Sequence, residues 1–151
     1  MKRKVLMSFL ALTLVATMAT GFANAQSINF TLSIPFEFTV GDKVFPAGQY
    51  TIKRNPIGSN EVLVIESANK KMSHDFKTRI FLSSDTATEN KKLVFTKYGD
   101  QRFLSQIWAI SPLGRSTRYI ISPSKQEREL GKQAKENQGG TQPEIVNIVI
   151  K

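Results

Sequence analysis

The sequence contains no cysteine, one histidine and one tryptophan among its 151 residues. Without cysteine the chain has no disulfides, no thiol chemistry, no thiolate metal site and no lipid-anchored cysteine behind a signal peptide. A metal site would have to combine the single imidazole of His74 with carboxylates. Stability must therefore come from apolar burial and backbone pairing.

The chain also lacks a G-x-S-x-G nucleophile motif and a glycine-rich phosphate loop. His74 lies on the mostly apolar side of an alternating segment, which favours a packed core histidine over a ligand or general base. Glu37 and Asp75 fall on polar faces, while Asp85 and Asp100 fall in loops, where solvated charges are expected. We therefore expect no catalytic residue, no cofactor site and no metal site.

Basic residues outnumber acidic ones, 21 to 12, but they are scattered. Nucleic-acid arms carry long Lys/Arg blocks, and this chain has none, so nucleic acid is not expected as a partner. Anionic glycans or lipid headgroups suit the positive charge equally well.

The first residues have the pattern of a signal peptide. Residues 1–4 are basic, residues 5–22 are uncharged, and the small-x-small motif ANA occupies 23–25. We expect residues 1–25 to be removed between Ala25 and Gln26, which leaves a basic chain of net charge +6 in the periplasm or outside the cell. A retained anchor is the alternative, because the uncharged run is at the lower limit for spanning a bilayer. No membrane span is expected after cleavage.

Residues 28–40 alternate with a period of two, which predicts a strand with one buried face. The even positions from Ile28 to Val40 are expected to be buried, and the exposed positions are expected to be Asn29, Thr31, Ser33, Glu37 and Thr39. The segment EVLVIES, 61–67, is apolar on both faces, as in a strand buried within a sheet. Further short alternating segments follow, separated by turn residues, so that the chain has about eight predicted strands in all.

The period changes near the end of the chain. Ser124 and Glu127 form a capping-box pattern, which predicts a helix over about 124–137, then a flexible break at 137–143 and a last strand at 144–150. The expected fold is one mainly β domain over 26–151, an antiparallel sandwich or small closed barrel of about eight strands with one C-terminal helix.

Three stretches carry a resemblance: IPFEFTVGDKVFPAGQYTI, LVFTKYGDQRFLSQIW and SKQEREL. Together they resemble a family of small exported bacterial proteins of unknown function, over about 34–130. The resemblance implies export and one compact β-rich domain, and it implies no activity, cofactor or catalytic residue.

The stretch YGDQRFLSQIW, 98–108, is the expected place for a local function. Strand alternation puts Phe103, Ser105, Ile107 and Ala109 on one face, and it puts Leu104, Gln106, Trp108 and Ile110 on the other. We expect one face to line the core, the helix to cover the second, and the lone tryptophan to be mainly structural. If the helix leaves that face open, a partner surface for a sugar or a protein would comprise Tyr98, Arg102, Gln106 and Trp108.

The resulting hypothesis is an exported, non-enzymatic β domain with a binding or structural role in the cell envelope or outside it, with an envelope glycan or protein as partner. One alternative is a hydrolase of envelope polymers that uses two carboxylates. Another is an outer-membrane β-barrel, which the doubly apolar segment at 61–67 and the non-aromatic C-terminus disfavour.

Overall fold

The computed structural model describes residues 28–57, 59, 61–86, 91–110, 115–136 and 142–150. The predicted signal peptide, its cleavage site between Ala25 and Gln26 and residues 137–141 of the expected break lie outside the described residues.

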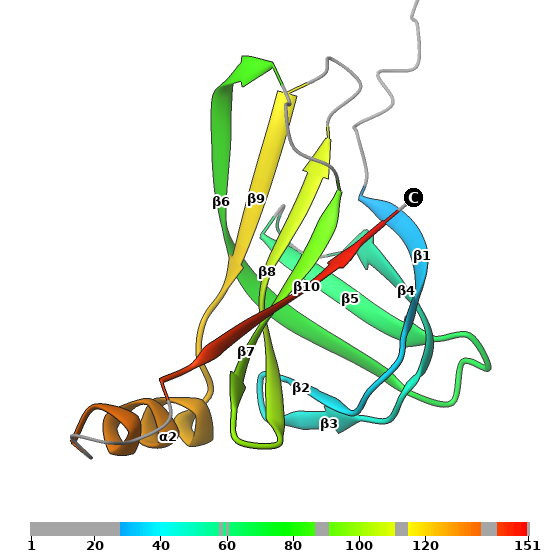
Figure 1. Ribbon diagram of the computed structural model, residues 1–151. Coiled ribbons are helices and arrows are strands. Elements are labelled where there is room, and N and C mark those ends of the chain that lie inside the picture. The colour runs from blue at the N-terminus through cyan, green and yellow to red at the C-terminus, as the bar shows by residue number, and fades with distance from the viewer. Residues whose placement is uncertain are drawn as a thin grey trace, which may run out of the picture.

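Within this part of the chain there are ten strands and one helix (Figure 1). Their bounds are β1 Asn29–Ile34, β2 Phe38–Val40, β3 Lys43–Phe45, β4 Gly48–Arg54, β5 Val62–Ser67, β6 Ser73–Thr86, β7 Lys92–Tyr98, β8 Gln101–Ile110, β9 Arg115–Ile121, α2 Lys125–Glu136 and β10 Glu144–Val149. The expectation of a mainly β chain with one C-terminal helix is confirmed, and the number of strands is larger than the expected eight or so.

All strands belong to one mixed sheet with the order β1-β4-β5-β6-β9-β8-β2-β3, and β8 also pairs with β7, which pairs with β10. Every pair is antiparallel except β2 with β8, so the expectation of a purely antiparallel sheet is wrong. The sheet does not close on itself, because no pairing joins its two ends among the described strands.

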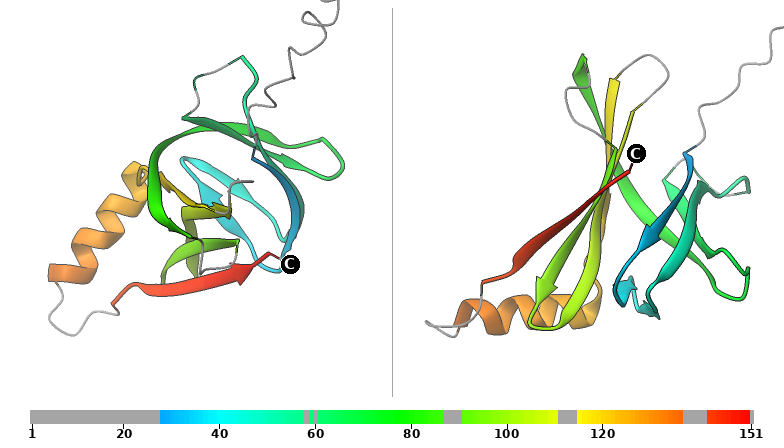
Figure 2. Two further views of the ribbon diagram at one scale, coloured as in Figure 1. Left: turned by 90° about the horizontal axis from the view of Figure 1, so that it is seen from above. Right: turned by 45° about the vertical axis from the view of Figure 1, so that its right-hand side comes forward.

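The long strand β6 divides the sheet into two halves. Its first part pairs with β5 and its second part pairs with β9, with a register shift between Leu82 and Thr86. Figure 2 shows the consequence: β1, β4 and β5 lie on one side of the molecule, and β7, β8, β9 and β10 lie on the other. Asp85, which was expected in a loop, lies within β6 instead, because this strand continues to Thr86.

The opening segment forms two strands instead of one. β1 pairs with β4, and after Pro35 the chain enters β2, which pairs with β3 and β8. Proline lacks the N–H that a ladder needs, so the break falls where pairing would otherwise continue.

The core lies between the two halves. Of the even positions expected to be buried, Ile28, Leu32, Ile34, Phe38 and Val40 are buried, whereas Phe30 and Phe36 are half-buried against the core. Four of the five positions expected to be exposed are exposed; Thr39 is buried, because β2 has strands on both sides. In β5 the residues Leu63, Val64 and Ile65 are all buried, as the doubly apolar pattern predicted.

The helix α2 begins where the capping box predicted. The backbone N–H of Glu127 donates to Ser124 Oγ over 3.1 Å, and the N–H of Arg128 donates to the Ser124 carbonyl over 3.0 Å. The first bond satisfies an N–H group of the first turn that has no partner inside the helix, and the second is the first α-helical bond, which the carbonyl of the capping residue accepts. The last strand, β10, follows the helix and pairs with β7.

Candidate functional site

A β-bulge at Ser105 decides which side chains of β8 face outward. Val94 of β7 lies opposite Gln106, and the next residue, Phe95, lies opposite Leu104, so Ser105 is the extra residue. Its hydroxyl donates to the Val94 carbonyl over 3.0 Å. The bulge shifts the alternation of side chains between the two faces by one residue. The expected faces are therefore wrong for the start of β8: Leu104 belongs to the core cluster with Ile107, and Phe103 does not.

Beyond the bulge, one outward residue from each of four neighbouring strands falls into a single transverse row. The register places Lys92 of β7 opposite Trp108 of β8, Trp108 opposite Arg118 of β9, and Arg118 opposite Phe81 of β6. We call these four residues the cation–aromatic row.

Cations and rings alternate along the cation–aromatic row. Lys92 Nζ lies 4.7 Å from the Trp108 ring centre, and Arg118 Cζ lies 5.3 Å from it. The same guanidinium lies 5.4 Å from the Phe81 ring centre. Each distance is within the range of a cation–π interaction, so Arg118 is held between two aromatic rings. The Trp108 indole N–H donates to Gln106 Oε1 over 3.1 Å, which fixes the ring on its strand.

The tryptophan is not the core residue that its sequence context favoured. Trp108 is half-buried and is neither in the core cluster nor packed against it. The helix α2 contacts β7 and lies at the end of the sheet where the hairpin from β7 to β8 turns (Figure 1). Trp108 lies toward the other end of β8, so the helix leaves its face open.

The structure separates the four residues proposed as a partner surface. Gln106 and Trp108 lie together on the open outer face. Tyr98 contacts α2 instead, because its hydroxyl lies 3.3 Å from the position that a Cβ on Gly131 would take. Arg102 lies at the opposite face, with its guanidinium 4.8 Å from the Phe36 ring, which itself packs on the core residue Phe95.

The open face is positively charged. A second transverse row, parallel to the first, runs through Val94, Gln106 and Ile120 to Arg79. These two rows contain Lys92, Arg118 and Arg79 and no carboxylate. Among the described residues no carboxylate forms an ion pair with Arg118 or Arg79. Sequence inspection missed the cation–aromatic row, because only the register brings its members together.

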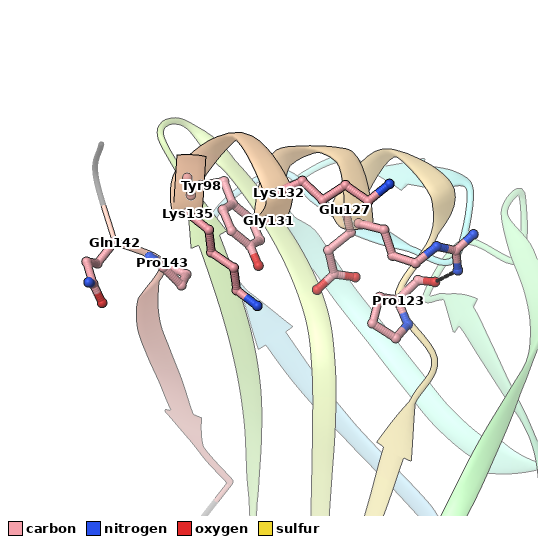
Figure 3. Close-up of a pocket in the computed structure, with 10 residues that line it drawn as sticks. Tyr98, Pro123, Glu127, Gly131, Lys132, Lys135, Gln142 and Pro143 are labelled. Atoms are coloured by element: carbon pink, nitrogen blue, oxygen red, sulfur yellow. Dashed lines mark hydrogen bonds between the residues drawn. The ribbon is translucent and has the colours of Figure 1, made fainter. Parts of the chain in front are cut away.

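A pocket of about 740 Å³ lies beneath α2, between the helix and the start of β10 (Figure 3). It is lined by Tyr98, Pro123, Glu127, Arg128, Gly131, Lys132, Ala134, Lys135, Gln142 and Pro143. Figure 3 shows the Glu127 carboxylate and the Tyr98 hydroxyl on the inner side of the helix, with the ammonium group of Lys135 near them, whereas the Lys132 ammonium points away and pairs with Glu129.

Glu127 is 8% exposed and is the only buried residue of the helix. Burial raises the pKa of its carboxyl, and a hydrogen bond from the Ser124 backbone, as in a capping box, offsets part of this rise. Burial also raises the pKa of the Tyr98 hydroxyl, and the negative charge of Glu127 adds to that effect. Above the usual carboxyl pKa, the negative charge of the buried Glu127 therefore lowers the stability of the folded state.

The variant Glu127→Gln is expected to melt at a higher temperature than the parent near neutral pH. The pKa of Glu127 in the folded state is raised above the ordinary 4.5 of the unfolded chain, so the folded state keeps the proton to a higher pH. The stability of the parent therefore falls as the pH rises from 4.5 through the raised pKa. The advantage of the variant should shrink as the pH falls toward 4.5. Thermal unfolding followed across this pH range measures it. Glu129→Gln, at an exposed position of the same helix, is the control; an equal pH effect there would contradict the assignment.

The other candidate groups lie apart from one another. His74 is half-buried, with its ring centre 6.4 Å from that of Phe45, and the exposed Asp75 accepts a hydrogen bond from Asn55 over 2.7 Å. Within the described ranges no three His, Asp or Glu side chains form a group that could hold a metal ion. In the same ranges no helix has the length and hydrophobicity to cross a membrane.

Comparisons with known protein families, with curated proteins and with solved structures give no match for this chain. What the protein does has to be inferred from its own residues.

Proposed function

We propose that the protein is an exported, non-enzymatic binding domain of sandwich-like architecture, and that its outer sheet face binds an anionic glycan of the cell envelope or its surroundings. The basic and apolar start of the chain and its ANA motif support export, as does the resemblance to small exported bacterial proteins. The two halves of the sheet, which face each other across an apolar core, support the sandwich.

The position of Arg118 between the rings of Trp108 and Phe81 is the observation that supports an anionic ligand. A guanidinium stacked on aromatic faces loses less conformational entropy on binding, and its N–H groups remain available at its edge. Such a planar fork matches a carboxylate or a phosphate, with which it forms paired hydrogen bonds. The lack of a carboxylate partner for Arg118 among the described residues leaves this capacity for a ligand.

The spacing of the charges favours an extended ligand over a single small anion. Lys92 and Arg118 are two strands apart, which corresponds to about 9–10 Å. Lys92 and Arg118 contact the Trp108 ring from the strands on either side of it, so a neutral sugar would have to displace a cation before it could stack there. A polymer with repeated negative charges can instead contact both cations from the solvent side while they stay on the aromatic rings.

The test is binding of polygalacturonate, a linear carboxylated glycan, to the purified protein and to Arg118→Gln. A hydrogen bond to a charged group is worth about 1.5–3 kcal/mol, so the variant should bind roughly tenfold more weakly or worse. Binding by the parent should weaken as salt is added, because the contacts are electrostatic. Lys125→Gln, which removes one exposed positive charge on α2, is the control and should bind nearly as the parent does.

Three results would overturn the proposal. The first is equal loss in Arg118→Gln and Lys125→Gln, which would indicate attraction by net charge alone. The second is equal binding of neutral dextran. The third is binding to vesicles rich in phosphatidylglycerol together with no binding to the glycan, which would assign the face to lipid headgroups.

A further inference from the structure

The strand β10, Glu144–Val149, lies at one margin of the sheet. It pairs with β7 on one side, and no described strand pairs with its other side (Figures 1 and 2). Among the described strands, β1 at one end of the strand order and the second part of β6, which pairs only with β9, also have an unpaired margin. Free margins of this kind can accept a further strand, from a partner or from a second copy.

The hydrogen-bond pattern shows which backbone groups this free margin offers. The N–H of Ile150 donates to the carbonyl of Lys91 over 2.8 Å, so Ile150 points toward β7. Backbone groups alternate in direction along a strand, so those of Ile145, Asn147 and Val149 point away from β7. The free margin therefore offers three residues whose N–H and C=O groups can pair with another strand.

The side chains of these same residues lie on the outer face. Ile145 is 55% exposed and Val149 is 54% exposed, and they flank Asn147 symmetrically. Within β10 there is no lysine, no proline and no bulge, and its one charged residue, Glu144, is at the start. Lysine, proline and bulges are the features by which proteins usually protect a free edge strand, so the edge of β10 is unprotected. By contrast, the outer face of β1 carries the polar side chains of Asn29, Thr31 and Ser33.

We propose that β10 pairs antiparallel with β10 of a second copy of this chain, in the register that places Asn147 opposite Asn147 of that copy. In this register Ile145 of each copy lies opposite Val149 of the other, so the two exposed apolar side chains cover each other. The three outward-pointing residues then form hydrogen-bonded pairs, which contribute about six backbone hydrogen bonds in total. A register shifted by one residue would set inward residues against outward ones, which the alternation of strands does not permit.

Symmetry also favours a second copy over an unrelated strand. A twofold axis through Asn147 makes the same six-residue segment both donor and acceptor, which gives a closed dimer and leaves no free β10 margin. The interface is narrow, at the small end of specific interfaces, so the dimer should be reversible and should depend on concentration.

The absence of native cysteine makes the register directly testable. In the purified exported protein, Asn147→Cys should form a disulfide-linked dimer on mild oxidation, because Cα atoms of a hydrogen-bonded pair are about 5.5 Å apart, within disulfide range. Ile145→Cys alone should not, because the two copies of position 145 would be about 13 Å apart. The double variant Ile145→Cys with Val149→Cys should cross-link again.

Sedimentation supplies a measurement without cross-linking. The parent should form a reversible dimer as its concentration rises, and Asn147→Pro should remain a monomer, because proline removes an N–H that points away from β7. Asn147→Val, which keeps the N–H, should still dimerise. Cross-linking of Ile145→Cys as readily as Asn147→Cys would overturn the register, and a parent that stays monomeric together with an Asn147→Cys variant that does not cross-link would overturn the dimer.

Discussion

The substitution Phe38→Ala is expected to lower the free energy of unfolding by about 3–5 kcal/mol. Phe38 is 1% exposed, and its ring centre lies 5.5 Å from Phe45, 5.2 Å from Tyr50 and 5.6 Å from Phe95. These rings come from β2, β3, β4 and β7, so the side chain joins both halves of the sheet. Its removal would leave a cavity that strands held by several ladders can only partly close.

An effect of this size is a large part of the stability of a small domain, which is typically about 5–15 kcal/mol. Unfolding in urea with linear extrapolation measures it. Phe81→Ala is the matched control, since Phe81 is 45% exposed and lies outside the core cluster, and it should change the free energy of unfolding by much less. Similar losses in both variants would contradict the placement of the core.

Local patterns predicted much of this fold. The period of two in the opening segment predicted most of the buried side chains of β1 and β2, although it missed Thr39 and Phe30 is only half-buried, and it did so even though Pro35 divides the segment into two strands. The capping box predicted the start of α2 at Ser124, because its hydroxyl and its hydrogen bond to Glu127 are local features. Gly99, with a φ of 58°, and Asp100 form the turn between β7 and β8, so Asp100 lies in a loop as expected.

Features that depend on distant partners were not predictable in the same way. The parallel pairing of β2 with β8 joins Thr39 to Phe103, which no local pattern indicates. The bulge at Ser105 reverses the faces of Phe103 and Leu104, and both residues are large and apolar, so the alternation of the sequence fits either assignment. The cation–aromatic row follows from this bulge, because it fixes which residues of β8 lie opposite β7 and β9.

Trp108→Ala is expected to separate the function of the outer face from the stability of the core. Because the indole is half-buried and lies outside the core cluster, its loss should cost about 1–2 kcal/mol, less than a buried aromatic. Binding to polygalacturonate should nevertheless weaken roughly tenfold or more, because Lys92 and Arg118 both lose the ring that positions them.

The variant Trp108→Phe is the control for this effect. It keeps an aromatic ring between the two cations and loses only the indole hydrogen bond to Gln106, so it should retain most of the affinity. Urea unfolding and glycan binding, measured on the same preparations, give both quantities. A loss of 3–5 kcal/mol in Trp108→Ala would instead make the indole a core anchor, and unchanged binding would exclude the cation–aromatic row as the glycan site.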